Sequence, residues 1–148
     1  MRLIALTLPD GESMTASAGR TEPSFEVDVD NPAKTWKGST IPADNHDRRK
    51  PRIVGLNMKG ESIREYALPS DLRRYTNPGF DVELLSNNTV LFVFPGKGIY
   101  EINRKGMVIW SHLDKKVSHD ADRLPNGNTL ITGTTALIEI APDKEIVW

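Results

Sequence analysis

Two stretches in the second half of the chain repeat one pattern of apolar runs and polar turns. The first spans residues 80–110 and the second spans residues 119–148, at a period of roughly 38–39 residues. Each stretch contains four short apolar runs, separated by turns rich in asparagine, glycine, lysine and aspartate. Short apolar runs bounded by such turns predict antiparallel strands. A four-stranded unit that repeats at this period is typical of a propeller blade.

A partial third copy precedes these two. Residues 53–63 align with residues 100–109. The alignment rests on a shared turn, Asn57-Met58-Lys59-Gly60 in the first and Asn103-Arg104-Lys105-Gly106 in the second. We therefore expect an all-β fold, a partial β-propeller of about three four-stranded antiparallel blades. The blades are predicted at residues 52–77 (incomplete), 78–116 and 117–148. Residues 1–51 lack the pattern and predict an irregular N-terminal segment with one or two strands.

One strand and one turn of the repeat carry further information. Val90-Leu91-Phe92-Val93-Phe94 is apolar at every position, and such a strand needs cover on both of its faces. Stacked blades provide that cover, whereas an isolated meander would leave one face in water. Asn126-Gly127 suits a two-residue hairpin, because both residues accept positive φ.

Composition narrows the function classes. The chain has 148 residues, 19 basic and 20 acidic, and a net charge of −1, so no long-range field attracts nucleic acid or an anionic membrane. Cysteine is absent, which removes disulfide and thiol chemistry. The apolar run near Met1 is short and is cut by Pro9-Asp10-Gly11, unlike a secretory signal or a spanning helix. The sequence fits any cellular compartment. The length does not suffice for a closed ring of six blades.

The last repeat resembles the blades of the arylsulfotransferase-like propeller family. The resemblance rests on residues 118–130, which include His119-Asp120 and Leu124-Pro125-Asn126-Gly127-Asn128, and on the closing Val147-Trp148. It implies a six-bladed propeller in which a histidine takes the sulfuryl group from an aryl sulfate and passes it to a phenol. His119 stands at the matching blade position. Gly133-Thr134-Thr135 occupies the region where the family carries an arginine.

His119 is the candidate catalytic residue. Neutral imidazole is a competent nucleophile near neutral pH, and Asp120 or Asp122 is close enough in sequence to orient it. One alternative is that His119 lines the channel and binds the ligand, with Asp120 as a further candidate binding residue. The other is a structural role, because Asp81 occupies the place of Asp120 in the preceding repeat, where Phe80 replaces the histidine. His46 and Arg48 form a second candidate, for binding an anion, with a solvated connection as the alternative.

The histidines have no spacing that suits a metal, and the sequence predicts neither a metal nor a cofactor. Two functions follow from the sequence. The first is a fragment of an arylsulfotransferase-like enzyme, inactive as this chain alone, with a small anionic aryl substrate. The second is a non-catalytic propeller module for ligand binding or protein assembly. The last blade lacks a polar cap, so self-association through exposed blade faces is also expected.

Overall fold

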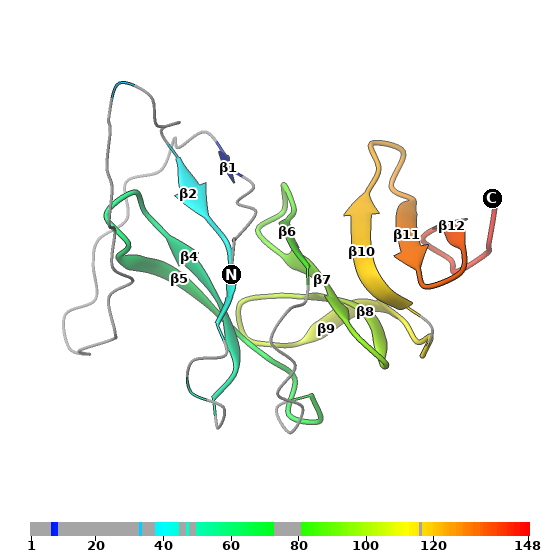
Figure 1. Cartoon of the computed structure of the whole chain (residues 1–148), viewed down its shortest axis with the longest axis horizontal. Helices are drawn as coiled ribbons and strands as arrows, with labels where there is room; N and C mark the ends of the chain where they lie inside the picture. The colour runs from blue at the N-terminus through cyan, green and yellow to red at the C-terminus, as the bar shows by residue number, and fades with distance from the viewer. Residues whose placement is uncertain are drawn as a thin grey trace.

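The computed structural model describes residues 7–8, 33, 38–44, 47, 50–72, 81–115 and 117–148. Within these ranges it contains twelve β-strands and no helix, so the expected all-β class is confirmed. The strands form three antiparallel sheets, which lie one after another along the molecule (Figure 1). We refer to them as the N-terminal, central and C-terminal sheets. No helix in the described part of the chain is long and apolar enough to cross a membrane.

The N-terminal sheet combines strands from distant parts of the sequence. It contains β1 (Thr7–Leu8), β2 (Ser39–Thr40), β3 (Ala43–Asp44), β4 (Arg52–Leu56) and β5 (Ser62–Ala67). Strand β4 pairs with β5 on one side and with both β2 and β3 on the other, and β1 pairs with β2. The boundary expected between residues 51 and 52 therefore falls inside this sheet.

The central sheet is a simple meander. Its strands are β6 (Val82–Leu84), β7 (Val90–Phe94), β8 (Gly98–Ile102) and β9 (Val108–His112), paired in that order. Every residue of β7 and β8 is buried. The prediction that Val90–Phe94 is covered on both faces is thus confirmed, because the other two sheets pack on opposite faces of this one.

The C-terminal sheet has the same meander with a less regular fourth segment. Its strands are β10 (Val117–Arg123), β11 (Thr129–Gly133) and β12 (Leu137–Ile140). The last residues run beside β12: the amide of Val147 donates to the carbonyl of Glu139 at 2.9 Å, and the amide of Glu139 donates to the carbonyl of Trp148 at 2.8 Å.

The sequence repeat is also a repeat of strand pairing. Leu84 pairs with Val90, which pairs with Ile102, and in the C-terminal sheet the corresponding trio is Arg123, Thr129 and Ile140. In the N-terminal sheet the trio is Thr7, Thr40 and Leu56. Positive φ also occurs at matching turn positions, 61° at Asn88 and 88° at Gly127. Corresponding residues of the three sheets can therefore be compared directly.

Two hydrophobic clusters hold the sheets together. The cluster between the N-terminal and central sheets is built from aromatic and branched side chains, with Tyr66, Phe92, Phe94 and Tyr100 the largest. Phe92 and Tyr100 stack with their ring centroids 5.6 Å apart. The cluster between the central and C-terminal sheets is smaller and entirely non-aromatic among its fully buried members, which are Leu91, Val93, Ile99, Ala121, Ile131 and Ile140. Burying each of the larger side chains contributes about 1.5–3 kcal/mol.

Candidate functional site

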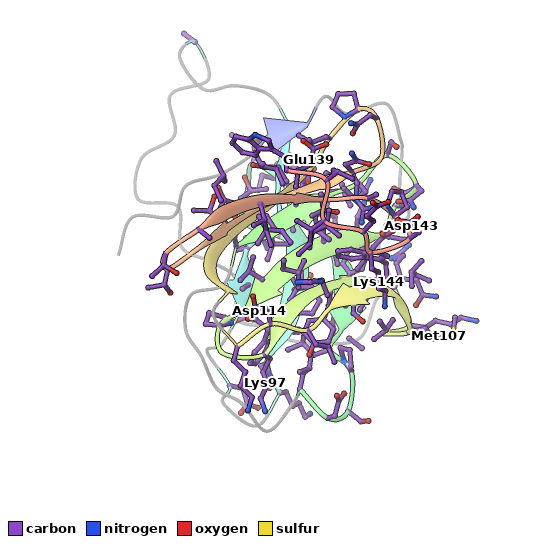
Figure 2. The ribbon with its side chains drawn as sticks, turned by 90° about the vertical axis from the view of Figure 1, so that its right-hand side faces the viewer. Lys97, Met107, Asp114, Glu139, Asp143 and Lys144 are labelled. Carbon is purple, nitrogen blue, oxygen red and sulfur yellow. The ribbon has the colours of Figure 1, made fainter. Side chains whose placement is uncertain are left out.

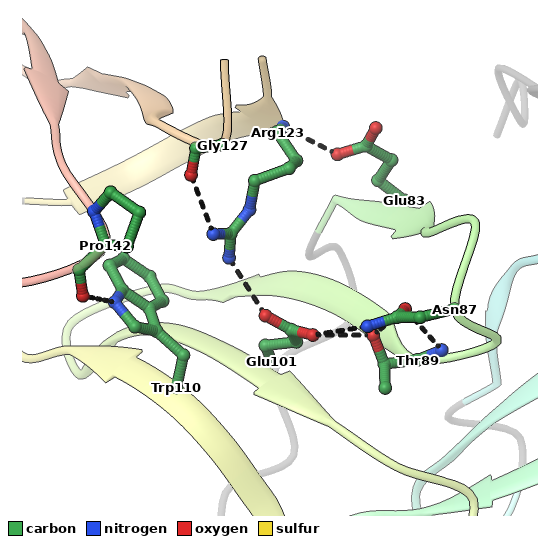
Figure 3. A network of polar contacts seen from close by, with 8 residues as sticks. All are labelled: Glu83, Asn87, Thr89, Glu101, Trp110, Arg123, Gly127 and Pro142. Carbon is green, nitrogen blue, oxygen red and sulfur yellow. Dashed lines mark hydrogen bonds and ion pairs between the residues drawn. The ribbon is translucent and has the colours of Figure 1, made fainter. Parts of the chain in front are cut away.

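A buried ion pair lies at the interface between the central and C-terminal sheets (Figure 3). Glu101 is the single charged residue of β8, and Arg123 ends β10. The guanidinium Nη2 of Arg123 lies 3.0 Å from Oε2 of Glu101, and the two side chains are 18% and 8% exposed. Ions buried to this extent are costly unless they are paired and hydrogen-bonded, so the two residues depend on each other.

The other oxygen of Glu101 is held by the turn between β6 and β7. Thr89 donates its hydroxyl to Oε1 of Glu101 at 2.6 Å, and Asn87 donates its side-chain amide to the same atom at 3.3 Å. The side-chain oxygen of Asn87 in turn accepts the backbone amide of Thr89 at 3.1 Å. Both carboxylate oxygens are thus satisfied, which is the condition for keeping a charge inside a protein.

Arg123 makes three further contacts besides its ion pair, although its buried Nε has no hydrogen-bond partner in the described part of the structure. Its backbone amide donates to Oε2 of Glu83 at 2.8 Å, and its Nη1 donates to the carbonyl of Gly127 at 3.1 Å. The guanidinium carbon lies 5.1 Å from the ring centre of Trp110, a cation–π contact. The indole of Trp110 donates to the carbonyl of Pro142 at 3.1 Å. Arg123 therefore joins strands of both sheets, and its guanidinium is committed to structure.

A group of carboxylates lies on and next to the first strands of these two sheets, β6 and β10. Asp81 precedes β6 and shares a side-chain hydrogen bond with Asp120 of β10. Burial, followed by this hydrogen bond and by repulsion from Asp120, raises the pKa of Asp81 to about 7. Burial also raises the pKa of Glu83, and both burial and the charge of Asp120 raise the pKa of Asp122. Asp81 therefore binds its proton more tightly than an ordinary carboxyl group does.

The residues predicted as sites have different outcomes. Asp120 is exposed and lies against Asp81, its counterpart in the preceding repeat. The backbone of His119 belongs to β10, but its side chain lies outside the described part of the structure, as do His46 and Arg48 altogether. Their predicted roles stay predictions.

Sequence reasoning missed the Glu101–Arg123 pair. A single acid in the apolar run Ile99-Tyr100-Glu101-Ile102 was the available signal, because a buried strand tolerates a charge only beside a partner. The partner could not be chosen from the sequence, since Leu84 occupies the position of Arg123 in the preceding repeat. The described residues contain no group of three or more histidine, aspartate or glutamate side chains placed to hold a metal ion.

Comparison with known proteins adds little to this picture. No protein-family model matches the chain, and no curated protein matches it. Among solved structures, the chain is similar to a protein of unknown function from Bacteroides caccae, with 18% sequence identity and a TM-score of 0.45. The similarity covers 75% of this chain and 41% of that protein. The chain thus spans less than half the length of that protein.

Proposed function

We propose that this chain is a non-catalytic β-propeller module that binds other polypeptides through the faces and edges of its sheets. The observation that supports a propeller is the repeated pairing of the three sheets, with the central sheet covered on both faces by its neighbours. Stacking of short antiparallel sheets in this manner is how propeller blades bury their faces.

Exposed apolar side chains support a role in binding. Ile109 of β9 is 55% exposed, and Val108 beside it is 47% exposed. At the other sheet, Ile146 and Trp148 are 59% and 68% exposed. Single exposed apolar residues are common on proteins, but runs of them along sheet edges mark surfaces that bind other chains.

Sulfuryl transfer by His119 is the second candidate, and it rests on the resemblance of residues 118–130 to arylsulfotransferase-like blades. A sulfate ester needs cations around its oxygens. Arg123, the described arginine on the same strand as His119, is instead paired with Glu101. It is therefore not available to hold a sulfate, which favours the binding module.

The two candidates are separated by an assay of the whole chain with p-nitrophenyl sulfate and phenol. We expect release of p-nitrophenol no faster than in buffer. Turnover that disappears in His119→Ala would overturn the proposal. In parallel, we expect the chain to bind the dye anilinonaphthalene sulfonate, and to bind it less in Ile109→Lys. Absence of dye binding would show that the apolar surfaces are not available and would also contradict the proposal.

A further inference from the structure

Glu101 and Trp110 together form a binding place for an arginine. They pair directly across β8 and β9, so their side chains lie on the same face of the central sheet. Arg123 enters this face with its guanidinium 3.0 Å from the carboxylate and 5.1 Å from the centre of the indole ring. A carboxylate beside an aromatic ring suits a guanidinium, which forms ion pairs and stacks on aromatic faces.

Glu139 and Trp148 repeat this arrangement in the C-terminal sheet. Asn126 donates to Oε1 of Glu139 at 3.3 Å, as Asn87 does to Glu101, and Asn128 donates to the same oxygen at 2.6 Å, as Thr89 does to Glu101. The backbone of Trp148 pairs with Glu139 as that of Trp110 pairs with Glu101. The carboxylate of Glu139 is therefore held by the turn between β10 and β11, as that of Glu101 is held by the corresponding turn between β6 and β7.

The two places differ in what covers them. In the described part of the chain, Glu139 forms no ion pair and Trp148 is 68% exposed. The apolar residues around the first place, Leu91, Val93 and Ile99, are fully buried. Their counterparts in the C-terminal sheet are Leu130, which is half-buried, Thr132, which is exposed, and Leu137, which is 46% exposed. Figure 2 looks onto this side of the molecule, where Glu139 is labelled.

We propose that Glu139 and Trp148 bind an arginine of a further β-sheet that packs on the C-terminal sheet as that sheet packs on the central one. This inference rests on the proposed function. The acid and the arginine are either both present or both absent at the two interfaces between sheets. The interface between the N-terminal and central sheets has neither, because Gly55 stands at the position of Glu101 and Leu84 at the position of Arg123. An interface that carries the acid is thus matched by a sheet that carries the arginine.

A second copy of this chain does not supply such a sheet. Its Arg123 is already engaged by Glu101. The first strand of its N-terminal sheet has Thr7 at the corresponding position. The face of that sheet turned away from the central sheet contains Val54, which is fully buried. The partner is therefore a different sheet with an arginine at the end of its first strand.

The test adds such a sheet to the complete chain. Because Trp110 is followed by residues 111–148, a second copy of residues 111–148 joined directly after Trp148 places a new sheet in register with the exposed face. The matched control is the same extension with leucine in place of its arginine. The tryptophans are labelled as 5-fluorotryptophan, and the ¹⁹F resonance of Trp148 is assigned with Trp148→Phe.

We expect the arginine-bearing extension to move the Trp148 resonance to a solvent-protected position and to resist limited proteolysis. The leucine extension, and the arginine extension on Glu139→Gln, should be cleaved roughly tenfold faster or more, as expected for loss of a charge-assisted hydrogen bond. The inference is overturned if Trp148 stays solvent-exposed with both extensions, or if both extensions dock equally.

A second copy as the occupant would also overturn the inference. Its sign would be concentration-dependent dimerisation of the unextended chain, measured by light scattering, that Glu139→Gln abolishes. Failure of the inference is distinguishable from failure of the proposed function. An extension that does not dock leaves dye binding and the absence of sulfuryl transfer unchanged, whereas transfer that depends on His119 refutes the proposed function whatever the extension does.

Discussion

Replacing Arg123 by leucine tests whether the ion pair joins the central and C-terminal sheets. Leucine is the residue that the central sheet carries at this position, at Leu84, so the side chain is compatible with the fold. The change removes the guanidinium and leaves the carboxylate of Glu101 buried, with Thr89 and Asn87 as its remaining donors. We expect Arg123→Leu to destabilise the protein strongly.

The size of the destabilisation follows from the burial of the ion pair between Arg123 and Glu101. Removing one partner of a buried pair typically costs about 3–5 kcal/mol, because the remaining charge is left uncompensated. Arg123 is 18% exposed, so water can partly replace it, and the lower end of that range applies, about 3 kcal/mol. For a chain of this size that corresponds to a fall in Tm of about 6–12 °C. The lost contact with Trp110 contributes about 0.5–1 kcal/mol of the total.

The assay is urea unfolding followed by circular dichroism and tryptophan fluorescence, in a double-mutant cycle with Glu101→Gln. Glutamine keeps a side-chain oxygen for Thr89 but carries no charge. The double variant should recover most of the loss, with a coupling energy of about 2 kcal/mol or more. Lys105→Leu, in an exposed turn, serves as the control and should change stability by less than about 0.5 kcal/mol.

Additive effects in this cycle would refute the reasoning. So would an Arg123→Leu variant within about 0.5 kcal/mol of the parent, because such a variant would show that the pair is solvated and contributes as little as a surface ion pair.

Three further changes have expected outcomes. The pKa of Asp81 is about 7 in the fold against an ordinary 3.8, so the folded state binds the proton more tightly than the unfolded state. The resulting stability is complete below pH 3.8 and is lost as the pH rises through 7. Asp81→Asn should therefore reduce this pH dependence in urea melts and stabilise the protein at pH 8 by roughly 1 kcal/mol, after allowance for screening of a half-buried group; an unchanged profile would contradict the raised pKa. Gly98→Ala should destabilise by more than about 3 kcal/mol, because its Cβ would lie 2.2 Å from a backbone oxygen of the facing strand at a φ of +139°. Gly96→Ala, with a φ of +75° but nothing within 4 Å, is its control and should cost only about 1 kcal/mol in the same thermal melts. Lys144→Gly should raise stability by roughly 0.5–1 kcal/mol by relieving a φ of 77°, and a loss of stability would show that the side chain contributes more than the strain costs.

The sequence predicted the central and C-terminal sheets because their strands are adjacent in the chain and rich in branched residues. The complete burial of Val90–Phe94 followed from its unbroken apolar run. The turn between β10 and β11 was predicted at the right place but with the wrong type. Gly127 alone in this turn has positive φ, and its amide donates to the carbonyl of Leu124 at 2.9 Å, so the central residues of the turn are Pro125 and Asn126, not Asn126 and Gly127.

The N-terminal sheet was less accessible to sequence reasoning. Strands β2 and β3 have two residues each, too few to show any alternation, and β1 pairs with β2 across a long separation in sequence. One signal was available: Leu8-Pro9-Asp10-Gly11 resembles Leu124-Pro125-Asn126-Gly127 of the last repeat, and the strand before each of these segments takes the same place in its sheet.

The candidate site was predicted less well than the fold. Asp120 was identified by its proximity to His119, but its observed partner is Asp81, which comes from another sheet. Contacts between sheets depend on how the sheets stack, and a single sequence does not encode that directly. For the same reason neither Glu101 nor Arg123 was recognised as half of a pair.

The pairing of β1 with β2 has a consequence for the order of folding. Residues 9–38 separate these two strands, whereas each later strand of the central sheet follows its partner after a turn of a few residues. Closing the longer loop costs more chain entropy, and non-local pairing slows folding. During synthesis Thr7 and Leu8 leave the ribosome before Ser39 and Thr40, and they cannot pair until these later residues have emerged. The hairpins of β6–β9 can form on the microsecond timescale as they emerge, so β1 pairs slowly compared with the strands of the central sheet.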